Sequence, residues 1–192
     1  MAKYNQQDNN DYLLENNLLG ITSFEELKKA ESFAFTLRAT ALERGGFTFK
    51  SYTKKEFKLL HYYLFQDIYP FAGKFRDVQL MKGNTRFCQV QFLNNYAIEL
   101  FEQMKNEPLW QSLDEAAERL AYFKSELNML HPFREGNGRT IRIFLYEYAK
   151  SKSVEWSYEV MDKDRYIQAM IEAILNIKSL KELFSETISW VQ

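Results

Sequence analysis

The apolar residues between positions 113 and 130 recur every three or four residues, which is the spacing of one face of an α-helix. Ser112 and Glu115 form a capping box at the start of this stripe. At its end, Pro132 disfavours a helical backbone at His131. The sequence therefore predicts a buried helix that ends where His131 begins a new segment. The apolar positions of the stripe are Leu113, Ala116, Ala117, Leu120, Phe123, Leu127 and Leu130.

Similar helical patterns cover most of the remaining chain. Capping boxes occur at Thr22 or Ser23 with Glu25 or Glu26, and at Thr53 with Glu56. Three prolines and seven glycines in 192 residues leave few positions for the turns that a strand-rich protein requires. We therefore predict an all-α fold, a bundle of about six to eight helices. The expected stripes run over residues 27–41, 57–64, 93–104, 141–148, 162–174 and 180–184, with Ile167, Met170, Ile171 and Ile174 facing inward in the fifth.

One segment and one end depart from this pattern. Residues 74–90 carry β-favouring side chains on both sides of a turn at 82–85, which predicts a single small hairpin. A lone hairpin is marginally stable, so we expect it to lie against the helices. Residues 1–12 are polar, and we expect them to be frayed or loosely attached.

The composition is typical of one globular domain. With 46% hydrophobic and 16% aromatic residues, a chain of this length can bury a sizeable core. A net charge of −1 gives no basic footprint for nucleic acid, and the lone Cys88 excludes an internal disulfide and a Cys-based metal cluster. Residues 1–10 are polar and contain no apolar h-region of a secretory signal, and no apolar run approaches the length of a membrane span. We therefore expect a cytoplasmic protein, although an export signal need not be apolar.

The candidate chemistry is concentrated in residues 131–142, which read His-Pro-Phe-Arg-Glu-Gly-Asn-Gly-Arg-Thr-Ile-Arg. Gly136 and Gly138 allow successive backbone N–H groups to point into one concavity, at the positive end of the following helix. Asn137 offers an amide donor to an oxygen that gains charge during a reaction. This part of the segment is suited to an anion.

Four charged or titratable residues of the same segment extend this interpretation. Arg139 and Arg142 share a helix face near the N-terminus, where cations are unfavourable unless an anion is bound. Glu135 would repel phosphates by itself, but with Mg2+ between them it becomes a metal ligand. His131 can take a proton from a hydroxyl near neutral pH. Together they indicate transfer of a phosphorus-centred group to a hydroxyl.

Each of these elements alone has an ordinary structural interpretation. A His before Pro is usually a cap or core residue, Gly-Asn-Gly is usually a turn, and arginines three apart are usually solvated. The functional interpretation depends on their joint spacing. By contrast, His61 lies in an amphipathic helix with no carboxylate or glycine loop near it in the sequence, so we interpret it as structural. Phe133 is expected to anchor the loop in the core.

The segment His131–Arg142 resembles the signature of the Fic family, H-x-F-x-[D/E]-G-N-G-R-x-x-R, at every defined position. Residues 64–73 resemble the family's segment ahead of its hairpin, and residues 19–22 resemble the start of bacterial stand-alone Fic toxins. The resemblance implies a helical Fic fold with one small β-hairpin, the flap. It also implies one domain over residues 1–192, with an N-terminal helical part at 1–50, a core at about 55–150 and C-terminal helices at 151–192.

The resemblance further implies transfer of AMP from ATP to a Ser, Thr or Tyr hydroxyl of a target protein. His131 would then deprotonate the hydroxyl, and Glu135 would hold Mg2+ between the phosphates. Gly138 favours AMP transfer, because phosphate-transferring relatives carry Lys at this position and bind the nucleotide in reverse. The other implied contacts are Gly136, Asn137 and Gly138 at the α- and β-phosphates, Arg139 and Arg142 at the outer phosphates, and Lys82, Gly83 and Asn84 at the flap, which aligns the target by strand addition.

Many family members carry an inhibitory helix with [S/T]-x-x-x-E-[G/N], whose Glu pairs with the second motif Arg. Glu43 and Glu186 lie in the first and last helical segments, where such a helix could occur. The residue four positions before Glu43 is Ala39 and the one four before Glu186 is Glu182, so neither segment has the required Ser or Thr. We therefore hypothesise that a small separate antitoxin supplies the helix, as in toxin-type Fic proteins.

Two further functions stay open from the sequence. The enzyme could transfer UMP, phosphocholine or phosphate instead of AMP, which the mass added to the target would reveal. Alternatively, the chain could be a catalytically silent module that binds nucleotide or protein. A loss of function on replacing His131 would separate either enzyme from that module.

Overall fold

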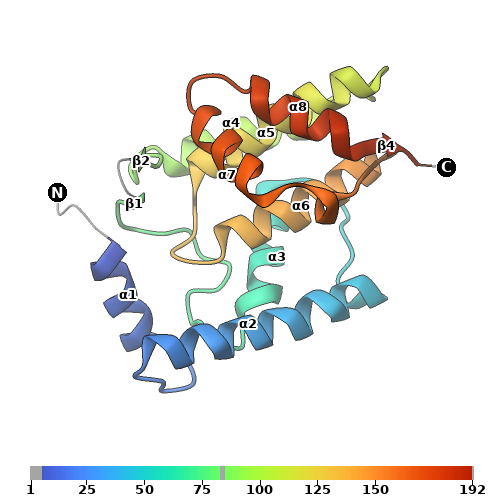
Figure 1. Cartoon of the computed structure of the whole chain (residues 1–192). Helices are drawn as coiled ribbons and strands as arrows, with labels where there is room; N and C mark the ends of the chain where they lie inside the picture. The colour runs from blue at the N-terminus through green and yellow to red at the C-terminus, as the bar shows by residue number, and fades with distance from the viewer. Residues whose placement is uncertain (1–5, 83–84, 192) are drawn as a thin grey trace.

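The computed structural model describes residues 6–82 and 85–191, with the side chains of residues 6–8 and 82 left aside. This part of the chain forms eight α-helices and two short two-stranded sheets (Figure 1). The helices are α1 (Gln6–Glu15), α2 (Phe24–Ala41), α3 (Lys54–Phe65), α4 (Leu93–Asn106), α5 (Leu113–Leu130), α6 (Asn137–Ser151), α7 (Lys163–Glu172) and α8 (Lys178–Thr187). A π-helical turn (η1, Leu42–Gly46) follows α2, and a 3-10 turn (η2, Tyr158–Val160) precedes α7.

Side-chain caps fix where four of the helices begin. The hydroxyls of Ser23, Thr53 and Ser112 accept hydrogen bonds from the backbone N–H groups three residues later, at 3.5, 3.4 and 3.1 Å. Asp162 caps α7 in the same way at 2.7 Å. Each such bond satisfies one of the N–H groups that a helix start leaves without a partner. The helices predicted from capping boxes are therefore confirmed.

The core centres on α6, which packs against α3 and α5. α5 packs against α4, α6 and α8, while α3 packs against α2, α4 and α6 (Figure 1). The Phe57 ring of α3 lies 5.3, 5.4 and 5.0 Å from the rings of Phe101, Phe133 and Phe144. All four side chains are almost fully buried. Each one stabilises the fold by about 2–3 kcal/mol through burial, so the core is built around the segment that contains Phe133.

The expectation of frayed residues at 1–12 was wrong for residues 6–12, which belong to α1. This helix is polar overall, yet Leu13 is buried in the core and the Tyr12 ring packs 5.9 Å from that of Phe71. The guanidinium of Arg134 lies over the same Tyr12 ring at 3.6 Å. In addition, Asn9 Nδ2 donates a hydrogen bond to the Arg134 carbonyl at 3.3 Å. Contacts with the loop after α5 thus hold α1 in place, although the polar composition of residues 6–12 does not predict a helix.

The predicted hairpin exists but is short. Antiparallel strands β1 (Met81–Lys82) and β2 (Thr85–Arg86) pair, while the turn expected at Gly83 and Asn84 lies outside the described residues. Beyond these short strands, the side chain of buried Arg76 supplies hydrogen bonds to the backbone in place of further strand pairing. Its guanidinium donates to the carbonyls of Val78 and Cys88, both at 2.6 Å, and to that of His131 at 2.8 Å. These bonds join both arms of the flap to the end of α5.

The carboxyl-terminal part differs from prediction in two ways. Strands β3 (Val154–Trp156) and β4 (Ile188–Trp190) form an unpredicted antiparallel sheet beside α6. The predicted inward placement of three isoleucines was also wrong, because Ile167 and Ile171 of α7 and Ile174 after it are 47%, 59% and 43% exposed, whereas Met170 is partly buried against the core as predicted. α7 lies at the surface and buries Ala169 instead. No helix in the described ranges combines the length and the apolar character that crossing a membrane would require.

Candidate active site

The candidate site begins where α5 ends. His131 is the C-cap residue of α5, in the left-handed region with φ 42° and ψ 59°. Its backbone N–H donates to the Leu127 carbonyl at 3.1 Å, and its own carbonyl accepts from Arg76 Nε at 2.8 Å. A non-glycine residue in this conformation is strained and persists only where its surroundings fix it. The chain therefore turns sharply at His131 and leads into the motif loop, residues 131–136.

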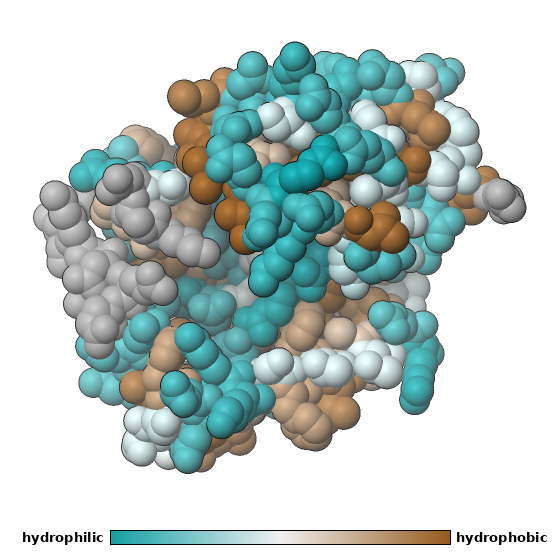
Figure 2. Space-filling model, viewed as in Figure 1, coloured by the Kyte–Doolittle hydropathy of each residue, from teal (hydrophilic) through white to brown (hydrophobic). Residues whose placement is uncertain are grey.

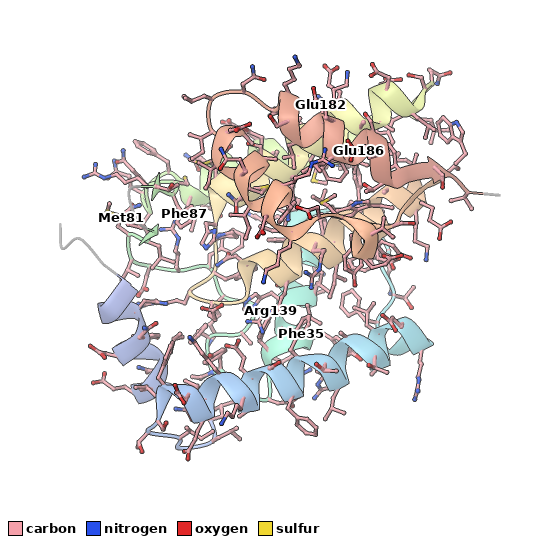
Figure 3. The ribbon with its side chains drawn as sticks, in the orientation of Figure 1. Phe35, Met81, Phe87, Arg139, Glu182 and Glu186 are labelled. Atoms are coloured by element: carbon pink, nitrogen blue, oxygen red, sulfur yellow. The ribbon has the colours of Figure 1, made fainter. Side chains whose placement is uncertain are left out.

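The imidazole of His131 is held in one orientation. Its ring stacks on that of Phe87, just after β2, with centroids 3.7 Å apart and planes 8° apart. Nδ1 lies 3.3 Å from the Asn128 carbonyl oxygen, so this nitrogen carries the hydrogen and donates it. Nε2 then has the lone pair that a general base requires. Figure 3 shows Phe87 and Met81 together on the flap side of the molecule.

The side-chain amide of Asn137 holds the motif loop together by bonding its backbone. Its Oδ1 accepts from the Phe133 backbone N–H and its Nδ2 donates to the Phe133 carbonyl, both at 2.8 Å. The residue is 3% exposed. The amide predicted to stabilise an oxyanion therefore bonds the loop backbone in this structure, and the oxyanion role stays a prediction. Phe133 is fully buried, so the expectation that it anchors the loop is confirmed.

His61 lies directly beneath the loop, although its neighbours in the sequence gave no sign of this. Its Nδ1 accepts from the Gly73 N–H at 2.9 Å, so Nε2 carries the hydrogen and donates to the Glu135 carbonyl at 2.9 Å. The ring stacks on Phe133 at 3.7 Å. Burial lowers the pKa of His61 to about 3. A neutral, fully buried imidazole thus fixes the backbone at the acidic residue of the motif.

α6 begins at a glycine that the packing requires. Gly136 is the N-cap residue, with φ +77° and no side-chain cap. A Cβ at this position would lie 2.4 Å from Cζ of Phe65. At Gly138, by contrast, a Cβ would meet nothing within 4 Å. The first backbone N–H groups of α6, with the positive end of its dipole, can therefore face an anion closely.

A cavity of about 420 Å³ lies against this helix start. Half of its lining comes from the motif, and half comes from β3, η2 and the start of α7, which sequence reasoning did not single out. The guanidinium of Arg142 lies 5.0 Å from the Tyr158 ring at the junction of the two halves. Figure 2 shows this face hollowed above α2, with mostly hydrophilic residues along the hollow. The lining residues are Glu135, Gly136, Gly138, Arg139, Arg142, Trp156, Tyr158, Met161, Lys163 and Tyr166.

Arg139 is held between two carboxylates. Its Nη2 forms a close ion pair with Glu31 of α2 and lies 3.5 Å from Glu135 Oε1. Its guanidinium also lies 5.0 Å from the Phe35 ring and 4.9 Å from the Phe65 ring, and Figure 3 shows Arg139 above Phe35. The resemblance to the Fic family implies that Arg139 holds outer phosphates. That role stays a prediction, because the guanidinium is engaged within the protein in this structure.

The donors present fit a metal ion that is shared with phosphates. Within the described residues no three His, Cys, Asp or Glu side chains cluster as a complete metal site. Glu135 is the one carboxylate among the described residues that line the cavity. Mg2+ commonly takes one or two carboxylates and completes its shell with phosphate oxygens and water. Glu135 could thus hold Mg2+ only together with such a ligand.

The remaining predicted residues lie outside this constellation. The side chain of Lys82 and all of Gly83 and Asn84 are outside the described residues. Glu186 of α8 pairs with Arg165 of α7, at 2.8 Å, and Figure 3 shows it far from Arg139. Glu43 is exposed on η1.

Comparison with known proteins agrees with this arrangement. Residues 51–149 match the Fic/DOC family. Protein adenylyltransferase VbhT of Bartonella schoenbuchensis is 35% identical over 159 residues, which is 82% of this chain but 33% of that relative. The probable protein adenylyltransferase Fic of Escherichia coli is 30% identical over 90% of this chain and 86% of its own length.

The fold is also similar to that of solved structures. BepC of Bartonella tribocorum, crystallised with bound AMPPNP, superposes with a TM-score of 0.81 at 23% identity, covering 92% of both chains. The chain spans about a third of VbhT and most of the E. coli relative. On the matched family region, the motif at every defined position and the fold, this chain belongs to the Fic/DOC family.

Proposed function

We propose that this chain transfers AMP from ATP to a Ser, Thr or Tyr hydroxyl of a target protein. The observation that carries the proposal is the cavity lined by Arg142 and the start of α6, which has no side-chain cap and directly follows the loop that contains His131. The enzyme class is supported by relatives of similar length that are named probable protein adenylyltransferases. The fold likeness to BepC with bound AMPPNP supports an adenine nucleotide as the donor.

The residues suit an in-line displacement at the α-phosphorus. The target hydroxyl oxygen attacks the α-phosphorus, and its proton passes to Nε2 of His131. A new P–O bond to the target forms while the bond to the leaving pyrophosphate breaks. The N–H groups at the start of α6 and the guanidinium of Arg142 face the charge that develops on the phosphate oxygens. When bound, Mg2+ would neutralise phosphate charge beside Glu135.

The second half of the cavity suits the nucleoside. Trp156, Tyr158, Met161 and Tyr166 provide flat or adaptable apolar surfaces, and Lys163 adds a cation at the rim. Gly138 leaves the start of α6 open, because no heavy atom lies within 4 Å of the position its Cβ would take. An open position there agrees with AMP transfer as inferred from the resemblance.

Two features of the proposal concern protein partners. Arg76 bonds the segments on either side of the flap strands, at Val78 and Cys88, to the end of α5 at His131, so a target segment that adds to the flap would be placed beside His131. An inhibitory helix supplied by a separate antitoxin is the second feature. It is supported by the engagement of Glu186 with Arg165 rather than with Arg142.

The test uses purified protein, bacterial lysate, Mg2+ and ATP labelled on the α-phosphate, with His131→Ala in parallel. We expect label on a lysate protein with the unmodified chain and none with the variant. ATP labelled on the γ-phosphate is the matched control, because AMP transfer leaves that label in solution. Label transferred only from the γ-position would contradict the proposal.

A further inference from the structure

A buried guanidinium lies between the flap and the candidate base. Arg76 is 4% exposed, and the described part of the chain offers its side chain backbone carbonyls as acceptors and no carboxylate as a partner. Burial lowers its pKa to about 10, so it stays charged at neutral pH. Burying a charge that no carboxylate compensates is costly, and a well-packed apolar side chain often gives a more stable core. This cost indicates that the guanidinium does more than stabilise the fold.

On the flap side, the guanidinium fixes the residue that follows Phe87. Arg76 Nη2 donates to the Cys88 carbonyl at 2.6 Å. The backbone N–H of Cys88 donates to the carbonyl of Met129 in α5, at 2.8 Å. Both backbone groups of Cys88 are therefore bonded. The buried ring of Phe87, one residue earlier, is thus confined to the end of α5.

On the other side, the same residue fixes the backbone at His131. Arg76 Nε donates to the His131 carbonyl at 2.8 Å, and the backbone N–H of Arg76 donates to the Pro132 carbonyl at 2.7 Å. The left-handed conformation of His131 persists only where its surroundings fix it, and these two bonds do so. A guanidinium carries its donors in a rigid planar fork. The carbonyls of His131 and Cys88 are therefore held at a set separation.

We propose that Arg76 is a positioning residue for the general base. It holds the Phe87 ring against the imidazole of His131 and thereby keeps that imidazole in one orientation. The two rings lie 3.7 Å apart with planes 8° apart, and Arg76 bonds the backbone beside one ring and at the other. The inference rests on the proposed function, because it concerns the orientation of the base which that function requires.

Proton NMR of the imidazole groups tests the inference without a target protein. The chain contains two histidines, so the signals that disappear in His131→Ala belong to His131. A ring stacked on an imidazole shifts the imidazole proton signals upfield. Phe87→Ala removes that ring and therefore measures the full size of the shift. We expect Arg76→Gln to lose most of the same shift, although Phe87 is still present.

Arg119→Gln is the matched control. The Arg119 guanidinium also makes two hydrogen bonds, to Glu107 at 2.6 and 2.7 Å, but it has no contact with the flap. Its loss should leave the His131 signals unchanged. Thermal unfolding shows whether each variant is folded. If Arg76→Gln does not fold, Arg76→Lys replaces it, because it keeps the charge but lacks the planar fork. The shift should then be lost in part, and an undiminished shift would contradict the inference.

Two further measurements separate positioning from general damage to the site. Arg76 is not among the residues that line the cavity, so calorimetry should show unchanged ADP affinity for Arg76→Gln. With ATP labelled on the α-phosphate, the rate of label transfer at saturating ATP should fall about tenfold. The ATP concentration that gives half of the maximal rate should not change.

The outcomes distinguish the inference from the proposed function. If Arg76→Gln is folded and keeps the His131 shift, the role of Arg76 is refuted while the proposed function stands. Equal losses of ADP affinity and of label transfer would also refute it, since they indicate a structural role only. If the unmodified chain neither transfers label nor binds ADP, the proposed function fails, whereas the NMR comparison still supports or refutes the link from Arg76 to the stacked rings.

Discussion

Replacing His61 by Gln should change how the stability of this protein depends on pH. The imidazole is fully buried, stacks on Phe133 and donates to the Glu135 carbonyl. Burial lowers its pKa in the folded protein to about 3, from an ordinary value of 6.5. Between these two pH values the unfolded chain binds a proton at His61 and the folded chain does not. Acid therefore favours unfolding, and the stability that His61 provides above pH 6.5 is progressively lost as pH falls towards 3.

The size of this effect follows from the two pKa values. A pH of 5 lies about 1.5 units below the pKa of the imidazole in the unfolded chain. The free energy of unfolding is therefore about 2 kcal/mol lower at pH 5 than at pH 7.5. Gln at position 61 keeps a donor towards the Glu135 carbonyl but has no such titration. The free energy of unfolding of the unmodified chain, minus that of the variant, should fall by about 2 kcal/mol between pH 7.5 and pH 5.

Urea unfolding followed by circular dichroism at several pH values measures this difference. The two proteins differ only at position 61, so their difference isolates the contribution of His61. The variant also loses the ring stacking, which lowers its stability by an amount independent of pH. Parallel stability curves for the two proteins would refute the account of a neutral His61 beneath the motif loop.

The remaining predictions concern the start of α6 and the orientation of the base. Gly136→Ala should lower the free energy of unfolding by about 2–4 kcal/mol, because its Cβ meets the Phe65 ring and its φ is positive, whereas Gly138→Ala should keep or raise stability by up to about 1 kcal/mol. In calorimetry Gly138→Ala should nevertheless weaken ADP binding, since its methyl group enters the cavity. Equal effects of the two changes on stability would contradict the first prediction, and unchanged ADP binding by Gly138→Ala would contradict the second. Phe87→Ala removes the ring that stacks on His131 and should lower kcat for AMP transfer about tenfold with little change in KM for ATP, and an unchanged kcat would show that the stacking does not orient the base.

The parts of the fold that the sequence predicted are those determined locally. Ser112 and the apolar stripe after it are sufficient to specify α5, because capping and helical periodicity depend on residues only a few positions apart. The motif loop was predictable for a similar reason. Its turn, its glycines and its anion-binding helix start all lie within residues 131–142.

The misses depend on contacts between distant segments. Nothing near Arg76 indicates that its guanidinium replaces a strand ladder, and β3 pairs with β4 across the whole of α7 and α8. Ile167 and Ile171 have the spacing of a buried face, yet the side of α7 that packs on the core is the one with Ala169 and Met170. Periodicity specifies a face of a helix but does not specify what covers it.

The candidate site follows the same rule. The sequence predicted the site residues within the motif, but it did not predict those that contact the motif from distant segments. His61 precedes Glu135 by 74 residues and Glu31 precedes Arg139 by 108. An ordinary buried histidine and an ordinary surface glutamate have the same local sequence as these two. Their roles become visible only when α2 and α3 are placed against the motif loop.

The central claim is that the transferred group is AMP and that it goes to a protein hydroxyl. The most direct measurement is peptide mass spectrometry of the lysate protein that acquires label from ATP labelled on the α-phosphate. The account predicts a Ser, Thr or Tyr side chain carrying AMP, present with the unmodified chain and absent with His131→Ala. A side chain carrying phosphate alone, or an AMP-modified peptide formed equally by the His131→Ala variant, would contradict it.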